Sequence, residues 1–333
     1  MQITALLRRS GAKAEVADDT SDKSSEADAP APVAATRSLR ARIHAWWEGY
    51  DLPPPAVAEA GAARAPEKPA VKPALKEVWP RERMEVAQIL WGKQFVSPLG
   101  AATIAELTVA LALEKDMTLM HVGCGMGGGT RALVAAHAVK ATGMDASVAL
   151  AKAGMDLSAA AKLKADAPIG PVDLASIQMK PAVFDRALVE HVLHALDDKE
   201  DALKRIIHAL KPDAHILVLD FVAQGKAPGP AIGAWAKADS APVKPWGLDT
   251  ARKTFAKLNI DLRKVTDESE RYRTLIVHGL DEFLKAAAGQ AVKRSLTASL
   301  KREVDMWAAR MAALDSGELK AMALYGVKVA KAG

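Results

Sequence analysis

The segment His121–Gly129, with the sequence HVGCGMGGG, is the part of the chain whose composition points most directly to a ligand. Glycine adopts positive φ values and lets a ligand approach the main chain where a Cβ atom would collide. An apolar run precedes the loop and a helical pattern follows it, so the free N–H groups of the helix start would face the ligand. Asp145 follows about 20 residues later, where its carboxylate can accept hydrogen bonds from ribose hydroxyls.

These features leave the identity of the ligand open. Gly123, Gly125 and Gly128 also satisfy the GxGxxG pattern of dinucleotide-binding proteins, and Asp145 would suit the ribose of NAD equally well. Glycines with a purely structural role are a further alternative. The loop and Asp145 therefore predict a nucleoside-containing ligand, and a dehydrogenase remains an alternative at this point.

The elements that must position this loop alternate between strands and helices from Val78 onward. Such alternation predicts an α/β fold with a parallel sheet and helices on both faces, and ligands of these sheets bind beyond the C-terminal ends of the strands. We expect strands at 117–122, 140–144, 184–189, 215–221, 260–265 and 321–329. We expect helices at 81–91, 99–113, 130–138, 147–163, 199–210 and 249–258, with two more across 270–314.

The N-terminal quarter of the chain has a different composition. It is rich in Ala, Asp, Ser, Glu and Pro, and such sequence buries too little apolar surface to offset the entropy of ordering. We therefore predict a mostly disordered arm over residues 1–78, with a short helix near 36–50, before a domain over 79–330. The short helix would carry Trp46 and Trp47, either loosely docked or as anchors for a protein partner.

The bulk properties narrow the class of protein. The chain has 333 residues, a net charge of +5 and one cysteine. No compact basic run predicts nucleic-acid binding, no apolar run approaches the ~20 residues of a transmembrane helix, and no disulfide can form within the chain. The start of the sequence lacks the order of charges and apolar residues in a secretory signal. We expect a cytoplasmic protein without a metal site.

Three segments resemble class I S-adenosylmethionine-dependent methyltransferases. HVGCGMGGGTRAL, GMDAS and FDRALVEHVLHALDDKEDALKRIIHALKPDAHILVLDF follow the ordered motifs of that family. The resemblance extends over about residues 79–330 and is strongest to small-molecule methyltransferases of the phosphoethanolamine and sarcosine type. Those proteins have a segment similar to Trp91–Gly100 and a final helix and strand similar to Met306–Lys328. The resemblance implies a Rossmann-like seven-stranded sheet.

The resemblance also implies a cofactor and its binding residues. The cofactor would be S-adenosyl-L-methionine, with the glycine loop around its methionine part, Asp145 at the ribose and Asp173 at the adenine. Glu190, after the strand at 184–189, would line the methionine side. The positions implied for the cofactor are His121, Gly123, Cys124, Gly125, Gly127, Asp145, Asp173 and Glu190.

His121 departs from the family pattern. The family usually has Asp or Glu at this position, where the carboxylate helps to hold the cationic end of the cofactor. An imidazole provides a hydrogen bond but no negative charge, and the loss could weaken binding by about 1–3 kcal/mol. We therefore expect weak cofactor binding that His121→Asp would restore. The departure also favours an alternative, a catalytically inactive methyltransferase-fold protein that acts as a binding partner or scaffold.

The resemblance implies methyl transfer to the nitrogen or oxygen of a small-molecule acceptor. His194 is the candidate general base, because it matches a histidine that assists catalysis in phosphobase methyltransferases, four residues after Glu190. The alternative is a histidine without a catalytic role.

Trp79 and Phe221 occupy positions where phosphobase methyltransferases have tyrosines, so we expect a more apolar acceptor pocket than a phosphobase requires. The residues expected to line it are Trp91, Phe95, Ser97 and Phe221, with Trp235 and Trp246 as further lid candidates.

Overall fold

A computed structural model describes residues 78–225, 228–287 and 293–329 of the chain. All of them lie in one unit, Leu75–Gly333. The predicted arm, with its helix near 36–50 and with Trp46 and Trp47, lies outside the described residues apart from Val78, so these features stay predictions.

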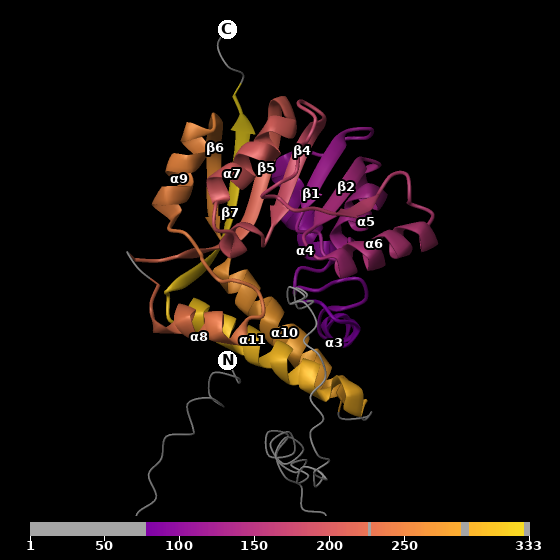
Figure 1. The fold of residues 1–333 in the computed structure, drawn as a ribbon, viewed down its shortest axis with the longest axis vertical. Helices are drawn as coiled ribbons and strands as arrows, with labels where there is room; N and C mark the ends of the chain where they lie inside the picture. Colours follow the sequence, from indigo (N-terminus) through magenta and orange to yellow (C-terminus); the bar gives the residue numbers. More distant parts are fainter. Residues whose placement is uncertain (1–77, 226–227, 288–292, 330–333) are drawn as a thin grey trace, which may run out of the picture. The chain divides into compact units, whose positions relative to one another are not determined.

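Seven strands form one sheet in the order β3-β2-β1-β4-β5-β7-β6 (Figure 1). The first five strands pair in parallel with one another, as predicted, whereas β7 runs antiparallel to both β5 and β6. The sheet is therefore mixed, and the parallel sheet predicted from the alternation of strands and helices does not extend to β7. The strands are β1 Thr118–Val122, β2 Lys140–Asp145, β3 Ile169–Pro171, β4 Phe184–Glu190, β5 Leu210–Ala223, β6 Ile260–Asp267 and β7 Leu319–Lys328.

The direction of β7 follows from the connection that precedes it. After β6 the chain forms two helices, α10 Ser269–Ala287 and α11 Thr297–Asp315, both of which lie near the end of the sheet where β6 finishes (Figure 1). Because the chain has not crossed back over the sheet, β7 enters from the same end and must run in the opposite direction. A parallel neighbour would require a crossover along a face of the sheet.

Helices cover both faces of the sheet. Successive side chains of a strand point to opposite faces. Met120 of β1 packs in the same core cluster as Leu203 of α7 and Phe255 of α9, which places those two helices on one face. His121 instead contacts Thr130 of α5, on the other face. The face helices are α4 Ala101–Leu107, α5 Gly128–His137, α6 Val148–Ala160, α7 Lys199–Ala209 and α9 Leu248–Lys257.

A further group of helices packs beyond the C-terminal ends of the parallel strands (Figure 1). It comprises α3 Arg81–Trp91, α8 Pro230–Ala238, α10 and α11, and α11 contacts the other three. No helix in the described ranges is both long enough and apolar enough to cross a bilayer.

Most predicted elements lie within a few residues of their expected bounds. The helix expected at 99–113 is shorter, because α4 ends in the 3₁₀ turn Thr108–Leu111. Of the described strands and α-helices, two are not predicted by the sequence pattern. Strand β3 has only three residues, too few to show a period, and α8 follows a proline- and glycine-containing stretch that reads as a loop.

Candidate functional site

A cavity of about 810 Å³ opens at the C-terminal ends of β1 to β4, and residues of α11 contribute to its lining. The segment Gln94–Leu99, the loops after these four strands and the side chains of Met306, Trp307 and Arg310 line it. The chain connects β1 to β2 on one side and continues from β3 to β4 on the other, so the order of strands reverses beside β1. Open α/β sheets bind their ligands at this kind of switch point.

The glycine loop forms the floor of the cavity at the end of β1. Gly123 has φ 80°, and a Cβ atom there would overlap the carbonyl oxygen of Glu190. Arg131 of α5 fixes the loop from behind, with Nη2 donating to the carbonyl oxygen of Met126 at 2.8 Å and Nη1 to that of Gly154 at 3.1 Å. Cys124 also lines the cavity, and burial raises the pKa of its thiol. The hydrogen bonds of Arg131 therefore fix the loop backbone, and its glycines leave the main chain accessible from the cavity.

Asp145 connects the end of β2 to the glycine loop. Its Oδ2 accepts a hydrogen bond from the N–H of Gly125 at 2.8 Å, and its Oδ1 accepts one from Ser147 at 2.9 Å. Burial raises the pKa of Asp145, although the two backbone N–H groups act against this. Each carboxylate oxygen retains a lone pair for a ligand. Asp173, after β3, also lines the cavity, but it is exposed and accepts hydrogen bonds from Ala175 and Ser176.

His121 lies behind the loop and does not line the cavity; it is 1% exposed. Its Nδ1 lies 2.9 Å from Thr130 Oγ1, and its Nε2 lies 3.1 Å from Glu190 Oε2. Glu190 does line the cavity, and its Oε1 accepts a hydrogen bond from Ser97 Oγ at 3.3 Å. The structure thus brings a carboxylate from β4 directly against the histidine in β1.

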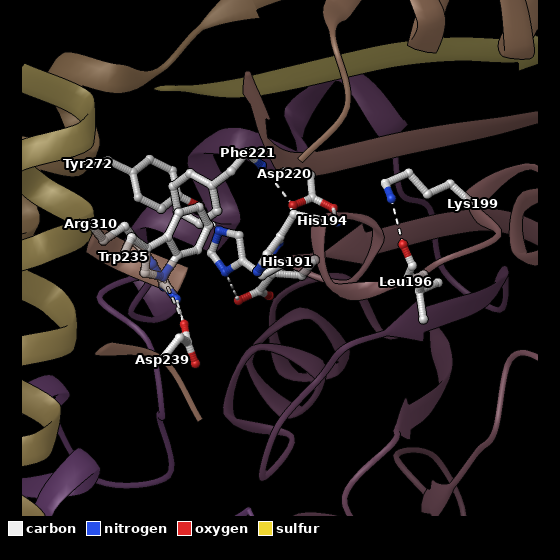
Figure 2. Close-up of polar contacts among 11 residues, drawn as sticks. His191, His194, Leu196, Lys199, Asp220, Phe221, Trp235, Asp239, Tyr272 and Arg310 are labelled. Carbon is white, nitrogen blue, oxygen red and sulfur yellow. Dashed lines mark hydrogen bonds and ion pairs between the residues drawn. The ribbon is translucent and has the colours of Figure 1, made fainter. Parts of the chain in front are cut away.

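His194 lies in a 3₁₀ turn, Leu193–Ala195, that follows β4, and its side chain faces Asp220 of β5 (Figure 2). Nδ1 lies 2.5 Å from Asp220 Oδ1, and the backbone N–H of His194 donates to Oδ2 at 3.1 Å. Burial alone would raise the pKa of Asp220, but the His194 ring and the hydrogen bonds outweigh burial and lower it. An ionised Asp220 accepts a hydrogen bond from Nδ1–H of His194, and in this tautomer Nε2 carries no hydrogen and can accept a proton.

His191, directly after β4, has the positive φ of 52° that is rare for residues other than glycine. Its ring stacks on Phe221 at a centroid distance of 5.1 Å, and its Nε2 contacts the hydroxyl of Tyr272 from α10. Burial lowers the pKa of His191 to about 4 and raises that of Tyr272. His191 is therefore neutral at physiological pH and forms part of the cavity wall.

Arg310 of α11 lies at the far end of the cavity from the glycine loop. Its Nη2 donates to Asp239 Oδ2 at 2.9 Å, and Trp235 Nε1 donates to the same oxygen at 2.8 Å (Figure 2). The guanidinium carbon lies 4.4 Å from the ring centroid of Trp307 and 4.7 Å from that of Trp235. Among the described residues, Arg310 Nε is buried without a hydrogen-bond partner. The part of the cavity around Arg310 therefore combines an ion pair with aromatic rings.

The residues predicted for the acceptor separate into two groups. Phe95 and Ser97 line the cavity. Trp91 instead packs on Trp307 at 4.9 Å, and Phe221 is fully buried behind His191. Of the lid candidates, Trp235 is fully buried beside His194, and Trp246 packs on the core cluster of the face that α7 and α9 cover.

Four site residues are not identified by the sequence analysis: Asp220, Asp239, Tyr272 and Arg310. Asp220 offers a signal, because a carboxylate within the apolar run HILVLDF is buried and needs a partner. The other three offer none, since they lie on helices or loops whose place at the cavity depends on packing.

Comparisons with known proteins agree with this geometry. Residues 120–216 match the family described as "Methyltransferase domain". Phosphoethanolamine N-methyltransferase 3 of Arabidopsis thaliana is 28% identical over 141 residues, which cover 42% of this chain but only 28% of that protein.

Solved structures extend the likeness beyond that segment. Phosphoethanolamine N-methyltransferase 2 of Haemonchus contortus, in complex with phosphomonomethylethanolamine and S-adenosylhomocysteine, superposes with a TM-score of 0.68 at 16% identity. The match covers 75% of this chain and 58% of that one. A Galdieria sulphuraria protein assigned as a sarcosine dimethylglycine methyltransferase gives a TM-score of 0.63 at 14% identity, covering 74% and 98% of the two chains.

The fold of the described unit is that of the S-adenosylmethionine-dependent methyltransferases. The predicted resemblance to the phosphoethanolamine and sarcosine type is confirmed, and the predicted class of fold is correct. The sequence match spans little more than a quarter of the curated relatives' length, so the activity of those proteins does not transfer to this chain by likeness alone.

Proposed function

We propose that this protein binds S-adenosyl-L-methionine in the cavity and transfers its methyl group to a nitrogen or oxygen of a small-molecule acceptor. The observation that carries the proposal is the arrangement of the cavity. A glycine loop and Asp145 lie on one side, and His194, which is paired with the buried Asp220, lines the same cavity.

The residues present suit this cofactor. Gly123 has a positive φ and no room for a side chain, since a Cβ atom would overlap the Glu190 carbonyl oxygen, and Asp145 retains lone pairs for two ribose hydroxyls. Asp173 lies at the end of β3, beyond Asp145, where the base of the nucleoside would lie. Two of the solved Haemonchus contortus structures contain S-adenosylhomocysteine or S-adenosyl-L-methionine. The bound cofactor supplies a methyl group already activated by its sulfonium.

His194 acts as the general base in this proposal. Asp220 holds its Nδ1 proton, so Nε2 is presented as the acceptor for the proton that an amine or hydroxyl loses. Phe221 and Trp235 pack on the His194 ring and keep its orientation. The other groups of the cavity position the two reactants and exclude water, which is the main requirement of a displacement at an activated carbon.

The acceptor lies against aromatic and charged groups at the α11 end. Trp307, Arg310 and Asp239 line this part of the cavity, and His191 contributes a neutral face. A cavity of about 810 Å³ holds the cofactor together with a small molecule, but not a folded macromolecule.

Calorimetry with S-adenosyl-L-methionine, S-adenosylhomocysteine and NAD tests the cofactor assignment. We expect both adenosyl ligands to bind and NAD not to bind. Preferential binding of NAD would support a dehydrogenase, and absence of binding at millimolar ligand would support the scaffold alternative.

Formation of S-adenosylhomocysteine with a panel of small amines and alcohols tests transfer. His194→Gln should bind the cofactor normally and lose transfer. Equal turnover by wild type and His194→Gln would remove this histidine from the mechanism.

A further inference from the structure

Among the described residues that line the cavity, four are carboxylates, and three of these already have a role or a strong partner. Asp239 is paired with Arg310. Asp145 is bonded to two backbone N–H groups at the end of β2, and Asp173 closes its own exposed turn. Glu190 is the exception. It is 8% exposed and lines the cavity, and its described neighbours are two histidines and a serine.

The cations of the cavity wall do not neutralise Glu190. Arg83 is bound to Glu303, and Arg310 is bound to Asp239. His191 Nδ1 lies 3.9 Å from Glu190 Oε1, but its ring is stacked in the wall and bonded to Tyr272. A buried carboxylate without a full positive partner is costly, so it suits a cationic ligand.

The order of strands determines which part of the cofactor meets Glu190. This step rests on the proposed function. Asp145 and Asp173 follow β2 and β3, so the nucleoside lies on that side of the glycine loop. Glu190 ends β4, on the opposite side of β1. A ligand that extends across the loop from the ribose therefore brings its amino-acid end, which carries an ammonium, to Glu190.

His121 has a definite role in this arrangement. Thr130 Oγ1 can donate to Nδ1 of His121, and Nε2–H can donate to Glu190 Oε2 at 3.1 Å. A neutral imidazole completes this chain of bonds, so it fixes the carboxylate without cancelling its charge. Ser97 fixes the other oxygen.

We propose that Glu190, held by His121, binds the ammonium of the cofactor. The Glu190 carboxylate at the end of β4 then supplies the negative charge that position 121 of β1 lacks. The structure thereby changes the expectation for His121→Asp. A new carboxylate at 121 would lie against Glu190 and repel it, so this variant alone should not improve binding. Exchange of both residues, His121→Asp with Glu190→Gln, should instead restore one carboxylate beside one neutral partner.

The test measures the coupling between Glu190 and the ligand's amine by calorimetry. The ligands are S-adenosylhomocysteine and its deaminated analogue, which differs only by replacement of the ammonium with hydrogen. Wild type should bind S-adenosylhomocysteine about ten-fold or more tightly than the analogue, the size expected for a hydrogen bond to a charged group. Glu190→Gln should bind the two ligands with nearly equal affinity, and the double variant should regain most of the ten-fold preference.

Controls separate this proposal from its alternatives. Glu114→Gln removes a carboxylate from an exposed position before β1, at the opposite end of that strand, and should keep the full preference. If Glu190→Gln does not fold, the comparison of the two ligands on wild type decides, since equal affinities there overturn the proposal. A preference that persists in folded Glu190→Gln also overturns it. Failure of wild type to bind either ligand, in contrast, refutes the cofactor assignment itself.

Discussion

The pH dependence of stability offers a strong test of the environment assigned to His191. This residue is largely buried, stacks on Phe221 and contacts the Tyr272 hydroxyl. Burial lowers its pKa from 6.5 to about 4. The charged groups that act on it are Glu190 and Asp220, which favour its protonation, and His194 and Arg310, which oppose it. The balance keeps His191 neutral in the folded protein well below the pH at which it is protonated in the unfolded chain.

The sign and magnitude follow from this difference. As pH falls through 6.5, His191 takes up a proton in the unfolded chain, whereas in the folded protein it is protonated only near pH 4. The stability from His191 is therefore complete above pH 6.5 and declines as pH falls. A difference of about 2.5 in pKa corresponds to about 3 kcal/mol in all, of which about 2 kcal/mol is lost between pH 8 and pH 5.

The variant His191→Asn isolates this contribution. Asparagine tolerates the positive φ at this position and does not titrate. Urea unfolding of wild type and variant at pH 8, 7, 6 and 5 gives the free energy of unfolding of each. We expect the advantage of wild type over the variant to shrink by about 2 kcal/mol from pH 8 to pH 5. An advantage that is constant with pH would show that the pKa of His191 is the same in the folded and unfolded protein and would refute the buried, neutral state of this ring.

Four further variants test the base, the cofactor side and the core. Asp220→Asn should lower methyl transfer by on the order of a hundredfold, because the amide no longer fixes the Nδ1 proton of His194. Calorimetry should show an unchanged affinity for S-adenosylhomocysteine. An equal loss of affinity would mean that Asp220 acts on the whole cavity. Asp145→Ala should weaken S-adenosylhomocysteine binding about ten-fold or more. Asp145→Asn keeps an oxygen that accepts from Gly125 and should weaken binding less. Equal losses of affinity in the two variants would assign Asp145 to loop structure alone. Phe255→Ala should lower the free energy of unfolding by about 3–5 kcal/mol in urea, because this ring is fully buried in the core cluster between α9 and the sheet; a loss under 1 kcal/mol would contradict the packing of α9.

The sequence by itself determines the elements and the cofactor loop. Its apolar runs and helical patterns are local, so every described strand except β3, and the face helices, can be located without a structure. The glycine loop and Asp145 are also local, because the loop must directly follow β1 and the carboxylate must end β2. The element β3 is missed since three residues, Ile169–Pro171, show no period.

Only the tertiary structure decides which distant residues meet. His194 and Asp220 lie 26 residues apart and come together because β5 pairs beside β4, which the sequence pattern does not specify. From the sequence alone, His121 indicates the loss of a cofactor-binding carboxylate. The pairing of β1 with β4 brings the Glu190 carboxylate beside it, which only the structure reveals. Arg310 reaches the cavity because α11 packs across the end of the sheet. Periodicity reports which face of an element is buried, whereas the choice of partner depends on the packing of the whole domain.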